Sequence, residues 1–393
     1  MGNMVWNTRK LYGKLFGAML VLRLTSECNM QCAYCYVAED GQPKSCTKVV
    51  SMGSVRKMLE YLEGEKTCGL QLILTGGEPL LYKPLIREIV ECAEKLTIPH
   101  WIGIITNATL LDEGFLRYAK EKRIAFTISL DSPVFRYNQF RTENNRNLHE
   151  RILENIDKAL EMDVAVGINA VVNSLNVRHL NSLTDYCLEK GIRDFSLLPI
   201  SDAGRAKETI NHSVNCTQMC EAMQEVVEHI ISVNETAGEV KVIERNIALL
   251  VKELMGIPTG PSCFSSPCGA GVTMLAMDLN GDIYPCDQYI GNEKMVLCNV
   301  ENENIEQRIA ENIALCAIVE KSKKRMDFCS ECEHKICNGG CTADHIAKYG
   351  IEGQGNRDYW CRYYKQFYSY LRDLVAKTPE KAKWLTRTYW NMN

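Results

Sequence analysis

The 19 cysteines of this 393-residue chain constrain it more than any other feature. The N-terminus has no long apolar stretch followed by a small-residue cleavage site, so we expect a cytoplasmic protein whose thiols stay reduced. A disulfide framework then explains the cysteines poorly, and a chain of this length does not need one. Metal ligation explains the cysteines better, and their spacing indicates which kind of metal site they form.

The composition is that of a globular protein with two or three domains. Hydrophobic residues make up 46% and charged residues 24%, enough for a sizeable core. The net charge is -4, from 45 basic and 49 acidic residues, so neither nucleic acid nor an anionic membrane is expected as a partner. The apolar run Leu15–Leu22 is shorter than the roughly 20 residues of a membrane helix, so we interpret it as part of a buried strand.

Short apolar runs alternate with helical patterns through the first half of the chain, which predicts an α/β fold with a parallel sheet. The predicted strands are Leu20–Leu24, Leu70–Thr75, Trp101–Thr106, Ala125–Leu130, Val164–Val171 and Phe195–Pro199. The predicted helices between them are Ser54–Leu62, Pro84–Lys95, Asp112–Lys122, Leu148–Met162 and Asn176–Glu189. Six such units suggest a partial (β/α)6 barrel, whose active site lies at the carboxyl ends of the strands.

Cys28, Cys32 and Cys35 follow the first predicted strand with the spacing C-x3-C-x2-C. Three thiolates on a cubane cluster leave one iron without a protein ligand, and an open metal position is what chemistry needs. A zinc knuckle and three buried thiols are the alternatives, although a zinc site would need a fourth ligand close by. Cys46 is the only cysteine near enough, and it is poorly placed.

With Tyr34 before the last cysteine, this spacing resembles the signature of the radical S-adenosylmethionine superfamily. The second predicted strand ends in Gly76-Gly77-Glu78-Pro79, which is similar to the family's GGEP motif. The resemblance implies a [4Fe-4S] cluster that cleaves S-adenosylmethionine to a 5′-deoxyadenosyl radical. It places Glu78 on the cofactor's amino group, Arg141 on its carboxylate and Leu198 on its adenine. The full set of implied cofactor contacts is Tyr34, Gly76, Gly77, Glu78, Asn107, Ser129, Asp131, Arg141 and Leu198.

Beyond residue 256 regular periodicity fades and cysteines become dense. Their order resembles the SPASM domain, which carries two auxiliary [4Fe-4S] clusters, so three clusters are expected in all. The resemblance assigns Cys263, Cys268, Cys286 and Cys341 to one cluster, and Cys329, Cys332, Cys337 and Cys361 to the other. This chain has four residues between Cys332 and Cys337 where the family commonly has five. A pair of zinc ribbons is the alternative. The other eight cysteines receive no role.

These assignments divide the chain into a barrel, a linker and an auxiliary domain. We expect the radical barrel over residues 1–235, a helical linker over 236–256, the SPASM domain over 257–370 and a tail over 371–393. Within this plan the stretch from Asn215 to Met255 is predicted to be helical. A last helix is predicted over Tyr363–Lys377.

Asp287 directly follows Cys286, in a stretch that resembles anaerobic sulfatase-maturating enzymes, where the matching aspartate acts as a base. A base is needed because a proton must leave once a hydrogen atom has been removed from carbon. A solvated carboxylate is the alternative. The same stretch also resembles maturases that crosslink ribosomally made peptides. Val37 and Leu74-Thr75 depart from the sulfatase-maturase pattern.

We therefore expect an oxidoreductase that modifies a ribosomally made peptide or protein through thioether or carbon–carbon crosslinks. Sulfatase maturation, which oxidises Ser or Cys to formylglycine, is the runner-up. A small-molecule radical enzyme and a non-catalytic iron–sulfur electron carrier are the other classes, but a carrier has no use for the Gly76–Pro79 motif.

The expected partners are a peptide or protein substrate and an electron donor of the flavodoxin or ferredoxin type. Only about nineteen residues precede the first predicted strand, too few for a leader-binding domain. A separate leader-binding protein is therefore expected if the substrate is a precursor peptide.

Overall fold

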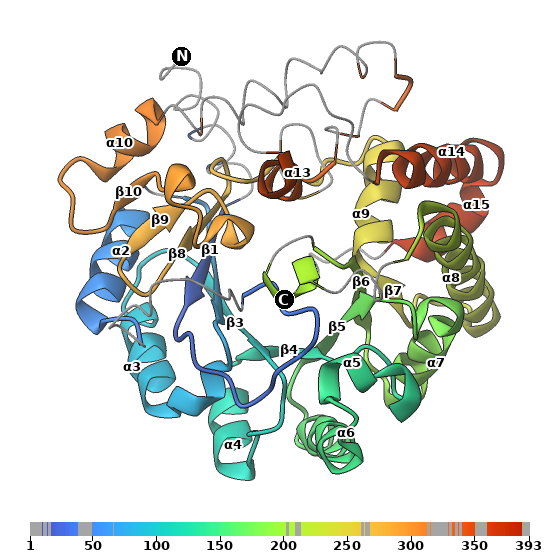
Figure 1. Ribbon diagram of the computed structural model, residues 1–393, viewed down its shortest axis with the longest axis horizontal. Coiled ribbons are helices and arrows are strands. Elements are labelled where there is room, and N and C mark those ends of the chain that lie inside the picture. Colours follow the sequence, from blue (N-terminus) through green and yellow to red (C-terminus); the bar gives the residue numbers. More distant parts are fainter. Residues whose placement is uncertain are drawn as a thin grey trace.

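Six apolar segments in the first half of the chain form parallel strands of one sheet, as the sequence predicts (Figure 1). They are β1 (Ala18–Arg23), β2 (Leu70–Thr75), β3 (His100–Thr106), β4 (Ala125–Ser129), β5 (Val166–Val172) and β6 (Asp194–Pro199). Each pairs with the next in chain order, and the strands curve into an arc with helices outside it. The predicted α/β barrel-like architecture is confirmed.

The computed structural model describes residues 17–37, 49–65, 67–201, 204–208, 214–260, 268–312, 340–349 and 360–386, with residues 10, 14, 263, 315, 329, 332–334 and 337. All the predicted site residues lie within these ranges. Cys46 and Cys316, two of the cysteines without a predicted role, lie outside them.

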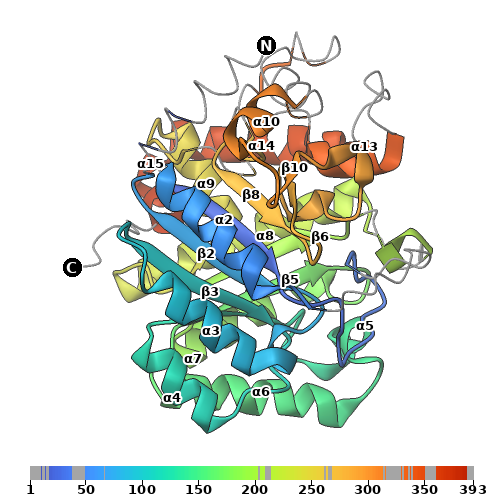
Figure 2. The same cartoon turned by 90° about the vertical axis from the view of Figure 1, so that its left-hand side faces the viewer.

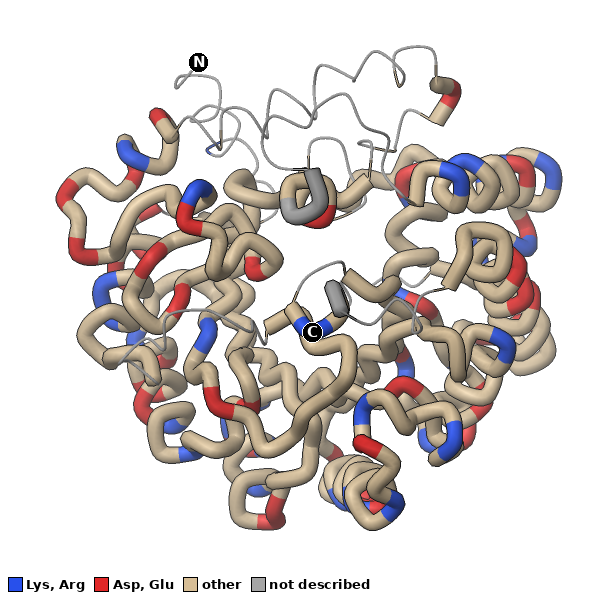
Figure 3. The backbone as a smooth tube through the Cα atoms, viewed as in Figure 1, with Lys and Arg blue, Asp and Glu red and all other residues tan. Residues whose placement is uncertain are grey.

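Amphipathic helices cover the outer face of the strands. They are α2 (Met52–Gly64), α3 (Lys83–Ala93), α4 (Glu113–Glu121), the short α5 (Gln139–Thr142), α6 (Arg146–Glu161) and α7 (Asn181–Lys190). The side chains of Ser51, Asp112 and Asn145 cap α2, α4 and α6 by accepting hydrogen bonds from first-turn amides. Acidic and basic residues alternate over this outer layer (Figure 3), while its apolar side chains form one core with the strands.

The stretch predicted as helical from Asn215 to Met255 is two helices with a strand between them. Helix α8 (Cys216–Ala237) ends at Gly238, whose φ of +70° breaks the helix. Strand β7 (Ile243–Glu244) then extends the sheet beside β6, and α9 (Arg245–Leu254) follows. The Glu244 side chain caps α9 through the amide of Ile247. The residues predicted as a helical linker, 236–256, therefore contain this two-residue strand as well as helix α9.

The second half of the chain adds three strands that the sequence did not indicate. Strand β8 (Met274–Met277) pairs in parallel with β1, and β9 (Asp282–Tyr284) and β10 (Cys298–Asn299) follow in antiparallel order. Among the described residues the sheet has the order β10-β9-β8-β1-β2-β3-β4-β5-β6-β7. Hydrogen bonding thus continues from the first strand directly into the cysteine-rich half, whose strands lie beside α2 in the side view (Figure 2).

The remaining helices of the described residues are α10 (Ile305–Glu311), α13 (Thr342–Tyr349), α14 (Cys361–Lys377) and α15 (Pro379–Ala382). Helix α14 confirms the predicted last helix and packs against α8 and α9. A bilayer-spanning helix, judged by length and apolar composition, is not found in the described part of the chain.

Candidate active site

Two loops meet at the carboxyl ends of β1 and β2, where the sequence predicts the active site. The amide of Gly77 donates to the carbonyl of Thr25, and the amide of Glu78 to that of Glu27, both at 2.8 Å. A Cβ atom on Gly77 would lie 2.1 Å from the Glu27 oxygen, and one on Gly76 would lie 2.6 Å from the Thr25 oxygen. The two glycines therefore permit a backbone contact that any side chain would prevent.

The Glu78 side chain is fully buried and turned into the protein. Its carboxylate accepts hydrogen bonds from Leu80 N at 3.0 Å, Thr106 Oγ1 at 2.7 Å and Asn107 N at 2.8 Å. Burial raises the pKa of this carboxyl, and the hydrogen bonds oppose the rise. The carboxylate thus ties β2 to the turn after β3, a role that the sequence did not indicate.

Asn107 lies beside the first cysteine of the loop. Its Nδ2 atom is 2.9 Å from Asn29 Oδ1 and 4.0 Å from Cys28 Sγ. The amide of Met30 lies 3.4 Å from the same sulfur. N–H groups directed at sulfur suit a thiolate ligand, since hydrogen bonds to sulfur help to set the properties of an iron–sulfur cluster.

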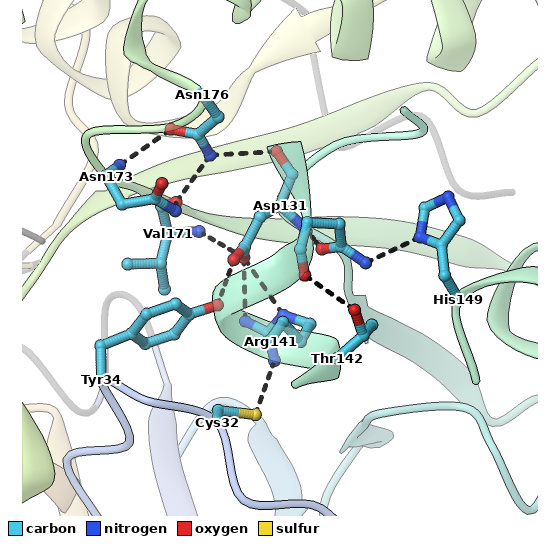
Figure 4. Close-up of polar contacts among 10 residues, drawn as sticks. Cys32, Tyr34, Asp131, Arg141, Thr142, His149, Val171, Asn173 and Asn176 are labelled. Carbon is cyan, nitrogen blue, oxygen red and sulfur yellow. Dashed lines mark hydrogen bonds and ion pairs between the residues drawn. The ribbon is translucent and has the colours of Figure 1, made fainter. Parts of the chain in front are cut away.

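Tyr34, Asp131 and Arg141 form one buried network (Figure 4). Asp131 Oδ1 accepts hydrogen bonds from Nε and Nη2 of Arg141, both at 3.1 Å, and from the amide of Val171 at 3.1 Å. The Tyr34 hydroxyl donates to the other carboxylate oxygen. Arg141 Nη1 reaches to 4.0 Å from Cys32 Sγ. The three predicted residues are together, with Arg141 paired to Asp131.

His149 and Asn138 support this network from behind. Asn138 Oδ1 accepts a hydrogen bond from the backbone amide of Asp131 at 3.0 Å, while Asn138 Nδ2 lies 2.9 Å from His149 Nδ1. His149 Nε2 lies 3.0 Å from the carbonyl of Pro133. An amide donor at Nδ1 and a carbonyl acceptor at Nε2 assign a neutral ring with its proton on Nε2. Burial lowers the pKa of His149, in keeping with that assignment.

Ser129 and Leu198 occupy strand ends on the same edge of the sheet. Ser129 closes β4 in register with Asn169, and Leu198 in β6 is in register with Val171. Both side chains are half-buried. Their contacts with a cofactor remain predictions.

A segment that the sequence analysis did not single out lies across the cysteine loop. The Arg205 amide donates to the carbonyl of Cys35, and its Nε to that of Cys32, both at 3.0 Å. A Cβ atom on Gly204, whose φ is +57°, would lie 2.3 Å from the Cys35 oxygen. The positive charge of Arg205 also acts on the Cys28 thiol, whose pKa burial raises. Only the glycine signals this contact in the sequence.

The cysteine loop offers a donor set that fits a cluster. Burial raises the pKa of the Cys32 thiol to about 12, against the attraction of Arg141. A bound metal replaces the thiol proton and so removes this obstacle to ionisation. The thiols of Cys28, Cys32 and Cys35 lie within electrostatic reach of one another. Together with the N–H groups directed at sulfur, these three residues suit a [4Fe-4S] cluster with one open iron.

A second set of thiols gathers beside η6 (Asp287–Tyr289), and we call it the first auxiliary group. Its members are Cys263, Cys268, Cys286 and Cys341. Burial raises the pKa of Cys286 and Cys341 well above the ordinary value, and the charges of the other members of the group raise it further. Cys268, Cys286 and Cys341 pack against one small core, and the four thiols lie within electrostatic reach of one another although up to 78 positions separate them in the sequence. Their role as cluster ligands stays a prediction.

Asp287 connects the two cysteine sites. Its Oδ2 atom accepts a hydrogen bond from the Tyr36 hydroxyl at 3.0 Å. Burial raises the pKa of the Asp287 carboxyl, and the bond from Tyr36 opposes the rise. The sequence singled out Asp287 but not Tyr36, which is adjacent to the expected ligand Cys35.

Backbone hydrogen bonds among the described residues connect some of the predicted ligands of the other auxiliary cluster. The Cys332 amide donates to the Cys329 carbonyl at 3.1 Å, and the Cys337 amide to that of His334 at 3.2 Å. Cys361 begins α14. Within the described residues, no three His, Cys, Asp or Glu side chains converge on a position for a single metal ion.

Comparison with known proteins agrees with this geometry. Residues 22–185 match the family model described as Radical SAM superfamily. The cysteine-type anaerobic sulfatase-maturating enzyme of Clostridium perfringens (strain 13 / Type A) is 24% identical over 93% of this chain and 99% of that protein. The serine-type enzyme of Bacteroides thetaiotaomicron is 21% identical over 90% of this chain and 89% of that protein.

Two solved structures have the same fold. The anSMEcpe structure with bound AdoMet and a Kp18Cys peptide matches with a TM-score of 0.76 and 20% identity, covering 93% of this chain and 99% of that one. Streptococcus suis SuiB bound to S-adenosylmethionine matches with a TM-score of 0.66 and 21% identity, covering 88% of this chain and 77% of that one. Residues 22–185, which match the family model, include both the cysteine loop and the glycine turn that contacts it, so this chain carries a radical S-adenosylmethionine domain over that part of its length.

Proposed function

We propose that this enzyme oxidises a cysteine or serine side chain of a peptide or protein, with Asp287 as the base. The contact between Tyr36 and Asp287 carries the proposal, because it holds a buried carboxylate beside the cysteine loop. When bound, the clusters and S-adenosylmethionine supply the radical that takes a hydrogen atom from carbon and the acceptor for the second electron. Asp287 accepts the proton that must then leave sulfur or oxygen.

Three clusters are proposed, each with its own cysteines. Cys28, Cys32 and Cys35 would hold the first, the first auxiliary group the second, and Cys329, Cys332, Cys337 and Cys361 the third. S-adenosylmethionine would lie against the network of Tyr34, Asp131 and Arg141, between the glycine turn and the ends of β4 and β6. There Ser129 and Leu198 are half-buried, which leaves part of each side chain for a ligand.

The curated relatives support the substrate class. Cysteine-type and serine-type anaerobic sulfatase-maturating enzymes match nearly the full length of this chain. A second candidate is a peptide-crosslinking maturase, because Val37 and Leu74-Thr75 depart from the sulfatase-maturase pattern. SuiB, solved with the precursor peptide SuiA, has the same fold over 88% of this chain. A flavodoxin or ferredoxin donor, and a leader-binding protein in the second case, belong to this proposal.

The test is done without oxygen. The reconstituted protein should contain about twelve irons, four for each of three cubane clusters, and should form 5′-deoxyadenosine from S-adenosylmethionine and dithionite. It is then given a sulfatase-type peptide containing cysteine or serine, and the product is treated with a hydrazine probe. A trapped aldehyde identifies formylglycine, and loss of two hydrogens without an aldehyde identifies a crosslink.

Asp287→Asn separates the base from the radical chemistry. This variant should still form 5′-deoxyadenosine but lose the aldehyde by at least about 100-fold, the usual contribution of a positioned base. Wild-type aldehyde formation by Asp287→Asn would remove Asp287 from the mechanism.

A further inference from the structure

The Tyr289 hydroxyl is buried among the thiols of the first auxiliary group without a partner among the described residues. We propose that it donates a hydrogen bond to a sulfur of the cluster that this group holds. The inference rests on the three-cluster proposal above and goes beyond it, since it assigns a specific residue to control one cluster.

The backbone fixes Tyr289 in place. It is the last residue of η6, and its amide donates to the carbonyl of Cys286 at 3.1 Å. The Tyr289 carbonyl accepts a hydrogen bond from the amide of Asn292 at 3.0 Å. The position of the ring is therefore coupled directly to one of the cysteines of the group.

The ring packs into a small core distinct from the main one. This core contains Val21 of β1, Ala276 of β8 and Ala343 of α13, and Cys268, Cys286 and Cys341 lie against it. Residues of β1, β8 and α13 thus share one small core with Tyr289 and these three cysteines. The same three thiols act electrostatically on its hydroxyl, together with Asp344.

The hydroxyl is the unexplained part of this residue. Tyr289 is 2% exposed, so bulk water does not reach the oxygen, and buried polar groups are almost always hydrogen-bonded. A phenylalanine would fill the same space without an unmade bond. A cluster would bring bridging and thiolate sulfurs to the group, and these are acceptors that a hydroxyl can use.

A hydrogen bond to sulfur stabilises the reduced, more negative cluster and so raises its reduction potential. Tyr289→Phe should therefore shift the midpoint potential of one auxiliary cluster to a more negative value. We expect about a tenfold change in the reduction equilibrium, which is 59 mV for one electron. Iron content and the potential of the first cluster should not change.

The potentials are measured on the full-length, fully loaded protein by a redox titration followed by electron paramagnetic resonance. The signal that changes on addition of S-adenosylmethionine belongs to the first cluster, which distinguishes it from the auxiliary signals. Tyr186→Phe is the matched control, because the Tyr186 hydroxyl in α7 is also buried without a partner among the described residues. This control should leave every potential unchanged.

Each outcome decides the question. A negative shift confined to one auxiliary signal in Tyr289→Phe, with iron content unchanged, supports the proposal. Loss of auxiliary iron from that variant alone overturns it, because the hydroxyl would then be needed to assemble the cluster site and not to set its potential. Full iron content with unchanged potentials overturns it. Absence of auxiliary iron from the wild-type protein would instead overturn the three-cluster proposal.

Discussion

The hydroxyl of Tyr36 lies 3.0 Å from Oδ2 of Asp287, although 251 positions separate the two residues in the sequence. Tyr36 follows the last cysteine of the loop after β1, and Asp287 follows Cys286 of the first auxiliary group. One hydrogen bond therefore joins the site proposed for radical formation to the site proposed for proton removal.

Replacing Tyr36 by phenylalanine should uncouple these two steps. The ionised Asp287 carboxylate would lose the hydrogen bond that the Tyr36 hydroxyl donates to it. A hydrogen bond to a charged group contributes roughly 1.5–3 kcal/mol. We expect 5′-deoxyadenosine formation to persist while modified peptide per 5′-deoxyadenosine falls about tenfold. Both products are quantified in the same reaction. Tyr137→Phe is the control and should keep the wild-type ratio, because the Tyr137 ring stacks on His179 with 4.0 Å between the ring centroids. Parallel loss of both products in Tyr36→Phe would contradict the prediction.

Removing the Arg141 guanidinium should destabilise the protein strongly. Arg141 and Asp131 form a buried ion pair at 3.1 Å, with side-chain exposures of 10% and 0%. Arg141→Gln would leave the Asp131 charge buried without its partner, which costs about 3–5 kcal/mol. The free energy of unfolding is measured by denaturant titration of the metal-free protein.

Arg117→Gln provides the comparison for this measurement. Arg117 pairs with Glu113 at 3.1 Å on the surface of α4, with 72% and 70% of the side chains exposed. Such a pair contributes about 0.3–0.5 kcal/mol. Equal losses in the two arginine variants would mean that burial of the Asp131 pair has no energetic consequence.

The stability of the fold should depend on His149 as the pH falls. Burial lowers the pKa of His149 below its unfolded value of about 6.5. The unfolded chain therefore binds a proton more readily, and stability that is fully present above pH ~6.5 is lost as the pH falls through the folded pKa. His149→Gln should reduce the slope of unfolding free energy against pH in this range, where one histidine contributes at most about 1.4 kcal/mol per pH unit.

Denaturant titrations of the metal-free protein at several pH values give this slope. The exposed His179 supplies the control, because His179→Gln should keep the wild-type slope. If His149→Gln and the wild-type protein have the same slope, the neutral assignment of the ring is wrong.

The sequence predicted the parts of the fold that local patterns specify. Strands β1 to β6 are five to seven residues long and apolar, and the structure has each within two residues of its predicted limits. Strands β7 to β10 have only two to four residues. Strand β8 is recognisable only through its pairing with β1, which is more than 250 residues distant. No local periodicity indicates such a contact.

In the site, too, the sequence indicates which residue types are present but not how their side chains are oriented. The motif identified Glu78, but the direction of its carboxylate depends on Thr106 and Asn107 in another loop. Arg205 lies in no motif, and its role arises only because β6 ends beside the cysteine loop. Sequence therefore indicates which chemical groups are present, while their partners follow from the three-dimensional arrangement.

Replacing Gly204 by alanine should displace the segment that lies across the cysteine loop. The new Cβ atom would lie 2.3 Å from the carbonyl oxygen of Cys35 and 2.7 Å from that of Tyr36, so the loop or the segment must move. We expect the variant to fold but to retain less iron in the first cluster, and to bind S-adenosylmethionine at least about tenfold more weakly, since moving the segment breaks two hydrogen bonds to the loop.

Gly191→Ala separates this clash from backbone strain. Gly191 also has a positive φ, +71°, but nothing lies within 4 Å of the position of its Cβ atom. Both variants incur the cost of about 1–2 kcal/mol for an alanine in left-handed geometry, and only Gly204→Ala meets the loop. Iron analysis and equilibrium binding of S-adenosylmethionine to the loaded proteins compare the two. Equal effects would show that backbone strain alone is responsible, whereas a loss confined to Gly204→Ala supports a role for this segment in holding the cysteine loop.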